Sequence, residues 1–140
     1  MSRKELQLLS RIRLREARAL ANLGMSDGAY YLAGYAVECA LKACIAKRTE
    51  RYEFPDKEKA VASYSHAFGK LLNVAGLERS QRLEAQHDST FRTNWDIVQL
   101  WSPHRRYLIT DATDAATTNE LIEAVGDRNH GVVRWIKLHW

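Results

Sequence analysis

The sequence contains few cysteines and few prolines, with two of each in 140 residues. Cys39 and Cys44 are five residues apart on a predicted helix, so their side chains point about 140° apart and cannot bridge each other. We therefore expect two reduced, packed thiols, which is the usual state of cysteine in the cytosol.

Signals for export and for membrane insertion are also missing. The first residues, "MSRKELQLLSRIRLREARAL", are periodic and charged, and they show neither the apolar core nor the cleavage site of a signal peptide. The apolar run Tyr30–Lys47 is about as long as a bilayer span. However, Glu38 and Lys42 lie at its centre, and the mean hydropathy of the chain is -0.42. We expect a cytoplasmic protein that does not bind membranes.

The residues that bind metals in proteins are present but badly spaced. Five histidines and two cysteines occur, and none of them form a ligand pair at the spacing of a zinc site. The sequence therefore predicts no metal site, and nothing in it indicates a cofactor.

The pattern that is present is helical. Hydrophobic residues make up 46% of the chain, their spacing is helical almost throughout, and no stretch alternates for long as a strand would. This predicts one all-α domain over residues 1–140. Helices are expected at about 3–23, with Leu9, Ile12, Ala19, Leu20 and Leu23 facing inward, at 26–48 with Ser26 or Asp27 as N-cap, at 56–62, from Ser65 to Gly76, at 77–101, from Thr113 to Gly126, and in the tail.

The helix at 26–48 should lie at the centre of the bundle, because its many small residues let neighbouring helices approach closely. Glu38 and Lys42 interrupt it four residues apart, a spacing that favours an ion pair within the helix. A buried charge is costly unless it is paired, so another polar group should face them. An arginine such as Arg106 is one candidate for that group.

The charge of the chain is mildly basic, with a net charge of +4. Lys4, Arg11, Arg15 and Arg18 recur at nearly heptad spacing and predict a basic stripe on the first helix. A solvated face is the preferred interpretation of this stripe, and a phosphate-binding face is the alternative.

Three segments, "LANLGMSDGAYYLAGYAVECALKACIAK", "SYSHAFGKLL" and "WSPHRRY", resemble in order and spacing the HEPN family of small helical domains. The resemblance covers about residues 15–137. It implies an up-and-down bundle of about five helices, commonly a homodimer. It also implies a separately encoded minimal nucleotidyltransferase as partner, with which such domains act either by binding nucleotide or as its toxin partner.

Other HEPN members are metal-independent ribonucleases, whose motif is an arginine followed after four to six residues by a histidine. Here Arg105 and Arg106 occupy the expected place, but positions 110–113 hold Thr, Asp, Ala and Thr. Two other pairs have the right spacing: Arg82 and His87, and Arg134 and His139 near the end of the chain. Such pairs are expected by chance in a chain with this many arginines and histidines. The resemblance therefore favours a protein without catalysis, with Arg134 and His139 as the fallback pair.

The candidate ligand-binding residues are polar side chains from three places: the central helix, the start of the helix expected after Ser65, and the segment after Pro103. In this interpretation an arginine holds phosphate and the tyrosine stacks on a base or ribose. The set is Glu38, Lys42, His66, Arg105, Arg106 and Tyr107. For His66, a hydrogen bond to the bundle is favoured over a role as a catalytic base.

Three functions follow from these observations. The first is a HEPN-type module that binds nucleotide or nucleic acid and acts with a nucleotidyltransferase as a toxin–antitoxin-like pair. The second is a metal-independent HEPN ribonuclease toxin. The third is a structural interaction module in which the ionic cluster only specifies the bundle.

Overall fold

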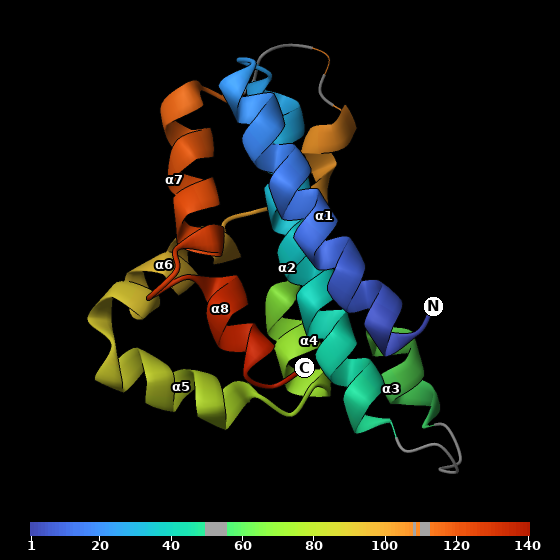
Figure 1. Ribbon diagram of the computed structural model, residues 1–140. Helices are drawn as coiled ribbons and strands as arrows, with labels where there is room; N and C mark the ends of the chain where they lie inside the picture. Colours follow the sequence, from blue (N-terminus) through green and yellow to red (C-terminus); the bar gives the residue numbers. More distant parts are fainter. Residues whose placement is uncertain (50–55, 108, 110–112) are drawn as a thin grey trace.

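The computed structural model describes residues 1–49, 56–107, 109 and 113–140, and in this part of the chain it is all-helical, with no strand. The all-α prediction is confirmed, but the described residues form more helices than the expected five (Figure 1). The elements are α1 (Arg3–Asn22), α2 (Ser26–Arg48), α3 (Lys57–Ala62), α4 (Phe68–Val74), α5 (Glu78–His87), α6 (Ser89–Gln99), the 3-10 helix η1 (Pro103–Tyr107), α7 (Ala115–Gly126) and α8 (Val132–Lys137).

The two longest helices, α1 and α2, form an antiparallel pair against which α4, α7, α8 and η1 pack. Helix α3 packs against α4, α5 against α6, and α6 against α7 and α8. The turn between them contains Gly24, whose positive φ of 75° suits a residue without a side chain. A hydrogen bond of 2.7 Å from Ser10 Oγ to the carbonyl of Ala36 ties the two helices together inside the core. The buried residues of α1 are Ser10, Leu14 and Ala17.

The residues predicted to form the inward face of α1 agree only in part with the residues that are buried. Of the five residues predicted to face inward, three are half-buried and two, Ala19 and Leu23, are exposed. Leu23 comes after the last helical residue, where the chain already turns toward α2 and leaves the core. The basic stripe of Lys4, Arg11, Arg15 and Arg18 is exposed, as a solvated or ligand-binding face requires.

Helix α2 is the central helix, as its small residues predict. It packs against α1, α4, α7, α8 and η1, and its alanines at 33, 36, 40 and 43 have no exposed surface. Both cysteines on it are free and buried. Burial raises the pKa of each thiol, Cys39 and Cys44, to about 11.

Three helix starts differ from the predictions. The expected helix at 77–101 is two helices, because Asp88 leaves the helical conformation and accepts a hydrogen bond from the Phe91 amide as the N-cap of α6. Helix α4 begins at Phe68 instead of following Ser65, and Ser65 Oγ accepts a hydrogen bond from the Ala67 amide in the turn before it. Helix α2 already includes Ser26 and has no side-chain cap.

The end of α6 and the following η1 bring the chain back onto α2. Trp101 is buried against Gly34, where an added Cβ would clash with the atoms of the indole ring. The same indole stacks on Phe68 with ring centroids 5.2 Å apart. This arrangement places η1 beside the N-terminal half of α2.

Among the described residues, none of the helices combines the length and the apolar character that a membrane span needs.

Candidate functional site

One side of α2 carries four polar or aromatic residues, Tyr31, Tyr35, Glu38 and Lys42. Their spacing of four, three and four residues places them in one line along the helix. Glu38 is buried, and the other three are half-buried. We call this line, together with His66, Trp101, Arg106 and Tyr107 that pack around it, the α2 face.

Glu38 is the buried charge of the α2 face, with 2% of its surface exposed. Its Oε1 atom lies 2.8 Å from Lys42 Nζ, and its Oε2 atom lies 2.9 Å from His66 Nδ1. The ion pair predicted between Glu38 and Lys42 is therefore confirmed. The other polar group that faces the pair is His66, and both carboxylate oxygens are engaged.

The chain before α4 positions His66. Ser65 and Ala67 form a turn through the hydrogen bond already described, and Phe68 is anchored against Trp101. His66 thus reaches Glu38 with 46% of its side chain still exposed. The favoured interpretation of His66, a hydrogen bond to the bundle, agrees with this contact, and the exposed part of the ring remains accessible to a ligand.

Aromatic rings occupy the other end of the α2 face. The rings of Tyr31 and Tyr35 are nearly parallel, at 7°, with centroids 6.1 Å apart. Tyr31 also stacks on Trp101 at 6.1 Å. The rings are therefore held in a fixed order between α2 and the end of α6, with part of each tyrosine open to solvent.

Arg106 lies against the ring of Tyr107 and not against Glu38. Its guanidinium is 4.8 Å from the ring centroid of Tyr107, which is 69% exposed. Hydrogen bonds with the side chains of Tyr31 and Tyr107 raise the pKa of Arg106. Arg106 was a candidate partner for Glu38, and the structure does not show that contact. The exposed guanidinium of Arg106 instead contacts tyrosine side chains.

Arg105 points to a different place from Arg106. Its guanidinium lies 4.6 Å from the ring centroid of the buried Tyr30, and it donates a hydrogen bond to Thr113 Oγ1. Burial raises the pKa of Tyr30, and the charge of Arg105 opposes that change. Thr113 is held in turn by Asp27, whose Oδ1 accepts its amide at 2.9 Å. Arg105 therefore connects η1 to the start of α7, beside the α2 face.

The fallback catalytic residues, Arg134 and His139, each contact other groups. Arg134 lines a hollow with Arg18 and Arg128. His139 lies against Trp135, with ring centroids 4.9 Å apart. Burial, and then the charge of Lys47, lowers the pKa of His139. The two side chains have separate surroundings, since Arg134 lies on α8 and His139 follows its end.

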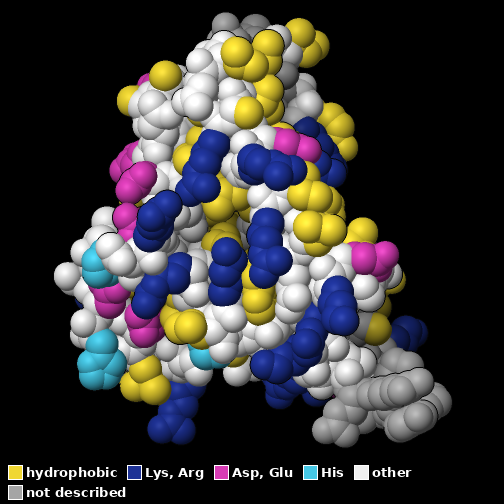
Figure 2. All heavy atoms as spheres, viewed as in Figure 1, with side chains coloured by type: hydrophobic (Ala, Val, Ile, Leu, Met, Phe, Trp, Pro, Cys, Tyr) yellow, Lys and Arg dark blue, Asp and Glu magenta, His cyan; other side chains and the backbone are white. Residues whose placement is uncertain are grey.

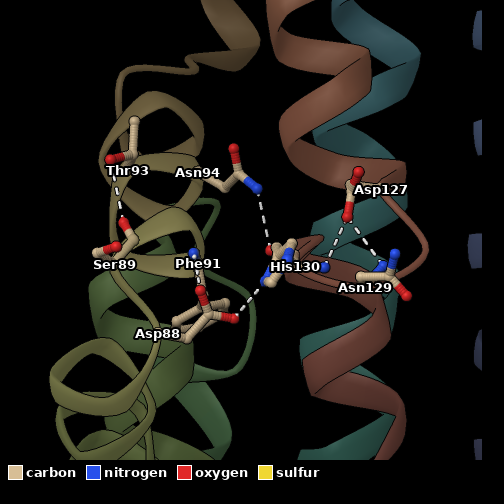
Figure 3. A network of polar contacts seen from close by, with 8 residues as sticks. All are labelled: Asp88, Ser89, Phe91, Thr93, Asn94, Asp127, Asn129 and His130. Atoms are coloured by element: carbon tan, nitrogen blue, oxygen red, sulfur yellow. Dashed lines mark hydrogen bonds and ion pairs between the residues drawn. The ribbon is translucent and has the colours of Figure 1, made fainter.

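A second contact between a carboxylate and a histidine joins the α5–α6 junction to the α7–α8 turn (Figure 3). Asp88 Oδ2 lies 2.6 Å from His130 Nδ1, and Asn94 donates a hydrogen bond of 3.0 Å to the His130 carbonyl. Asp127 Oδ1 accepts the amides of Asn129 and His130 and so closes the turn. These contacts fix the turn between α7 and α8.

Sequence reasoning missed Tyr31 and Tyr35 as members of the site. Their signal was available, since both share the helical line of Glu38 and Lys42. The Asp88–His130 contact had no such signal, because it joins residues 42 positions apart. Within the described part of the chain, no group of three or more His, Cys, Asp or Glu residues could hold a metal ion.

The arrangement of the α2 face suits a ligand that has both a flat ring and a negative charge. The tyrosines offer ring surfaces and Arg106 offers an exposed cation. At the other end, the solvent-exposed parts of Lys42 and His66 offer polar groups, while Glu38 holds these two side chains in place. Comparisons of the chain with models of protein families, with curated proteins and with solved structures gave no match.

Proposed function

We propose that this protein is a HEPN-type module that binds nucleotide or single-stranded nucleic acid and acts with a separately encoded minimal nucleotidyltransferase. It works as a homodimer and without catalysis of its own, in a toxin–antitoxin-like pair. The family is taken from the resemblance of the three segments, and the ligand from the α2 face.

The observation that carries the ligand is the exposed cation on exposed aromatic rings. Arg106 rests on Tyr107 and contacts Tyr31, so a phosphate held by the guanidinium would bring its base or ribose next to a tyrosine ring. The ordered stack of Tyr31, Tyr35 and Trp101 keeps this surface in place before a ligand arrives.

The absence of catalysis is supported by the separate surroundings of Arg134 and His139 and by the missing histidine after Arg106. The structural alternative draws on the Glu38 network, whose two carboxylate oxygens are already satisfied without any ligand. Binding measurements distinguish that alternative from the proposal.

Titration calorimetry with AMP, ATP and a short single-stranded RNA tests the proposal. The wild-type protein should bind at least one of them, and Arg106→Ala and Tyr107→Ala should each weaken that binding. Arg92→Ala is the matched control, because Arg92 is exposed on α6, away from the α2 face. No binding to any of the three at low salt would favour the structural alternative.

Two further measurements address catalysis and the partner. Incubation with total RNA in the absence of metal should leave the RNA intact, and cleavage that Arg134→Ala or His139→Ala abolishes would support the ribonuclease instead. Coexpression with a minimal nucleotidyltransferase encoded beside this chain should yield a complex that survives purification.

A further inference from the structure

A basic hollow lies on a part of the molecule distinct from the α2 face, where α1, α7 and α8 meet. Its volume is about 320 Å³, near the lower limit for small-molecule sites. The view in Figure 2 shows Lys and Arg side chains gathered around hydrophobic ones in this region. The cations that line the hollow are Arg18, Arg128, Arg134 and Lys137, and its apolar lining comes from Leu14, Val125 and Val133.

The four cations come from three separate parts of the chain. Arg18 belongs to the basic stripe of α1, Arg128 to the turn after α7, and Arg134 and Lys137 to α8. In the described part of the chain, none of the four forms an ion pair with a carboxylate. The fold therefore concentrates an excess of unpaired positive charge here.

The acidic residue in the lining, Asp127, offsets one of the four positive charges but, among the residues that the structure describes, forms an ion pair with none of the cations. Asp127 uses its Oδ1 to accept the backbone amides of Asn129 and His130, which lowers the pKa of its carboxyl group and holds the turn closed. Arg128 follows it directly in the same turn. Asp127 thus helps to position one of the cations instead of pairing with it.

Contacts within the protein already place two of the cations. Arg18 Nη2 donates a hydrogen bond of 3.2 Å to the Gly126 carbonyl at the end of α7. Lys137 Nζ lies 5.7 Å from the ring centroid of Trp140, and Arg11 lies 5.3 Å from the same ring. Partial burial and the nearby charges of Arg11 and Arg18 lower the pKa of Lys137. A bound anion would relieve this repulsion between like charges.

We infer that the hollow binds a small ligand that carries a phosphate group on a compact apolar body. Arginine guanidinium groups match phosphate geometry with two parallel hydrogen bonds, and Arg128 and Arg134 are exposed and form no hydrogen bond or ion pair in the described structure. The apolar lining gives the rest of the ligand a surface to cover. A hollow of about 320 Å³ with both cations and apolar side chains in its lining fits a small molecule better than the continuous backbone of RNA.

The inference goes beyond the proposed function, because the hollow shares no residue with the α2 face. Its test is an NMR titration of the full chain with inorganic phosphate, pyrophosphate, phenyl phosphate and a single-stranded RNA at low salt. Phenyl phosphate should bind more tightly than inorganic phosphate, since its ring can cover the apolar lining. The amide signals that shift should be those of residues 126–128 and 133–137.

Variants locate the site. Arg128→Gln with Arg134→Gln should weaken phenyl phosphate binding about ten- to hundredfold, as expected for the loss of charge-assisted hydrogen bonds. The pair Arg79→Gln with Arg92→Gln removes the same charge from exposed positions on α5 and α6 and should leave the affinity unchanged within about twofold. Arg134→Lys keeps the charge and the fold, and it should give an intermediate affinity.

Three results would overturn the inference. The first is no binding of phenyl phosphate or pyrophosphate by the wild type, with or without binding of RNA. The second is an equal loss in the two double variants, which would indicate unspecific attraction by net charge. The third is a loss of phenyl phosphate binding in Arg106→Ala, which would transfer that ligand to the α2 face and leave the proposed function standing.

Discussion

Glu38 is the residue on which the α2 face depends. A carboxylate with 2% exposure is stable only because Lys42 and His66 take up its two oxygens. Both partners reach solvent, since 22% of the Lys42 side chain and 46% of the His66 side chain are exposed. Solvation of these partners limits the cost of losing the carboxylate.

The substitution Glu38→Ala should therefore lower the free energy of unfolding by about 1–2 kcal/mol, less than the loss of one partner from a fully buried ion pair. Urea unfolding followed by circular dichroism measures it. Glu16→Ala is the control, because Glu16 and Arg13 form an ion pair with 41% and 30% of their side chains exposed. That control should cost less than about 0.5 kcal/mol, apart from any effect of helix propensity. Equal effects in the two variants would mean that the Glu38 network adds nothing to stability.

Gly34 allows Trp101 to reach α2, and no other residue fits there. An added Cβ would overlap the indole, which is itself held between Phe68 and Tyr31. We expect Gly34→Ala to destabilise the protein by about 1–3 kcal/mol through overpacking, although alanine favours the helix more than glycine does. Urea unfolding with tryptophan fluorescence as probe measures this change.

The control for Gly34 is Gly69 in α4, where an added Cβ meets no atom within 4 Å. Gly69→Ala should be neutral or stabilise the protein by up to about 1 kcal/mol. If Gly34→Ala were as stable as Gly69→Ala, Trp101 could not be packed against Gly34.

At the scale of elements, local patterns predicted the helices and missed the contacts that divide them. The existence and the end of α2 followed from its apolar run, and α3 followed from the cap by Asp56, which accepts the amides of Glu58 and Lys59. The helical spacing at 77–101 gave no reason for a break. Asp88 interrupts it, and His130, which stabilises Asp88 there, comes 42 residues later.

In the candidate site, too, a contact within one helix could be predicted from the sequence, and contacts between elements could not. The contact between Glu38 and Lys42 lies within one helix, so its spacing was enough to predict it. The approach of His66 depends on how α4 docks through Phe68, and the placement of Arg106 depends on the packing of Trp101 against Gly34. Such tertiary contacts leave no periodic signal in the sequence.

The junction at Asp88 gives a prediction that depends on pH. Hydrogen bonds from His130 and from the Phe91 amide lower the pKa of Asp88. Since the folded-state pKa is lowered, the contribution of Asp88 to stability is full above its unfolded-state pKa and is lost as the pH falls through the folded-state value. Asp88→Ala should cost about 1 kcal/mol near neutral pH and progressively less in acid.

Thermal unfolding of the wild type and of Asp88→Ala at a series of pH values measures this convergence. Asp96→Ala serves as control, because Asp96 is exposed within α6 and does not cap it. A difference between wild type and Asp88→Ala that stays constant from neutral to strongly acidic pH would contradict the role assigned to the ionised carboxylate.

For the molecule as a whole, the distribution of charge matters more than its sum. A net charge of +4 is modest, yet the hollow gathers four cations and Arg11 lies close to one of them. The Glu38 network, by contrast, balances its charges within itself. The cations around the hollow therefore repel one another, while the net charge of the remaining residues is close to zero. Without a bound anion, this repulsion lowers the stability of the folded state.

Salt should therefore stabilise the protein by screening the hollow, most strongly at low ionic strength, where the Debye length exceeds the distances between the cations. For the same reason Arg134→Gln should raise the free energy of unfolding by about 0.5 kcal/mol at low salt, with the gain disappearing as salt is added. Thermal unfolding over a series of NaCl concentrations measures both effects, and Arg92→Gln is the control expected to show neither gain nor change in salt dependence. If Arg134→Gln were less stable than the wild type at low salt, the cations around the hollow would not repel one another, and the argument that they are arranged for an anion would lose its electrostatic basis.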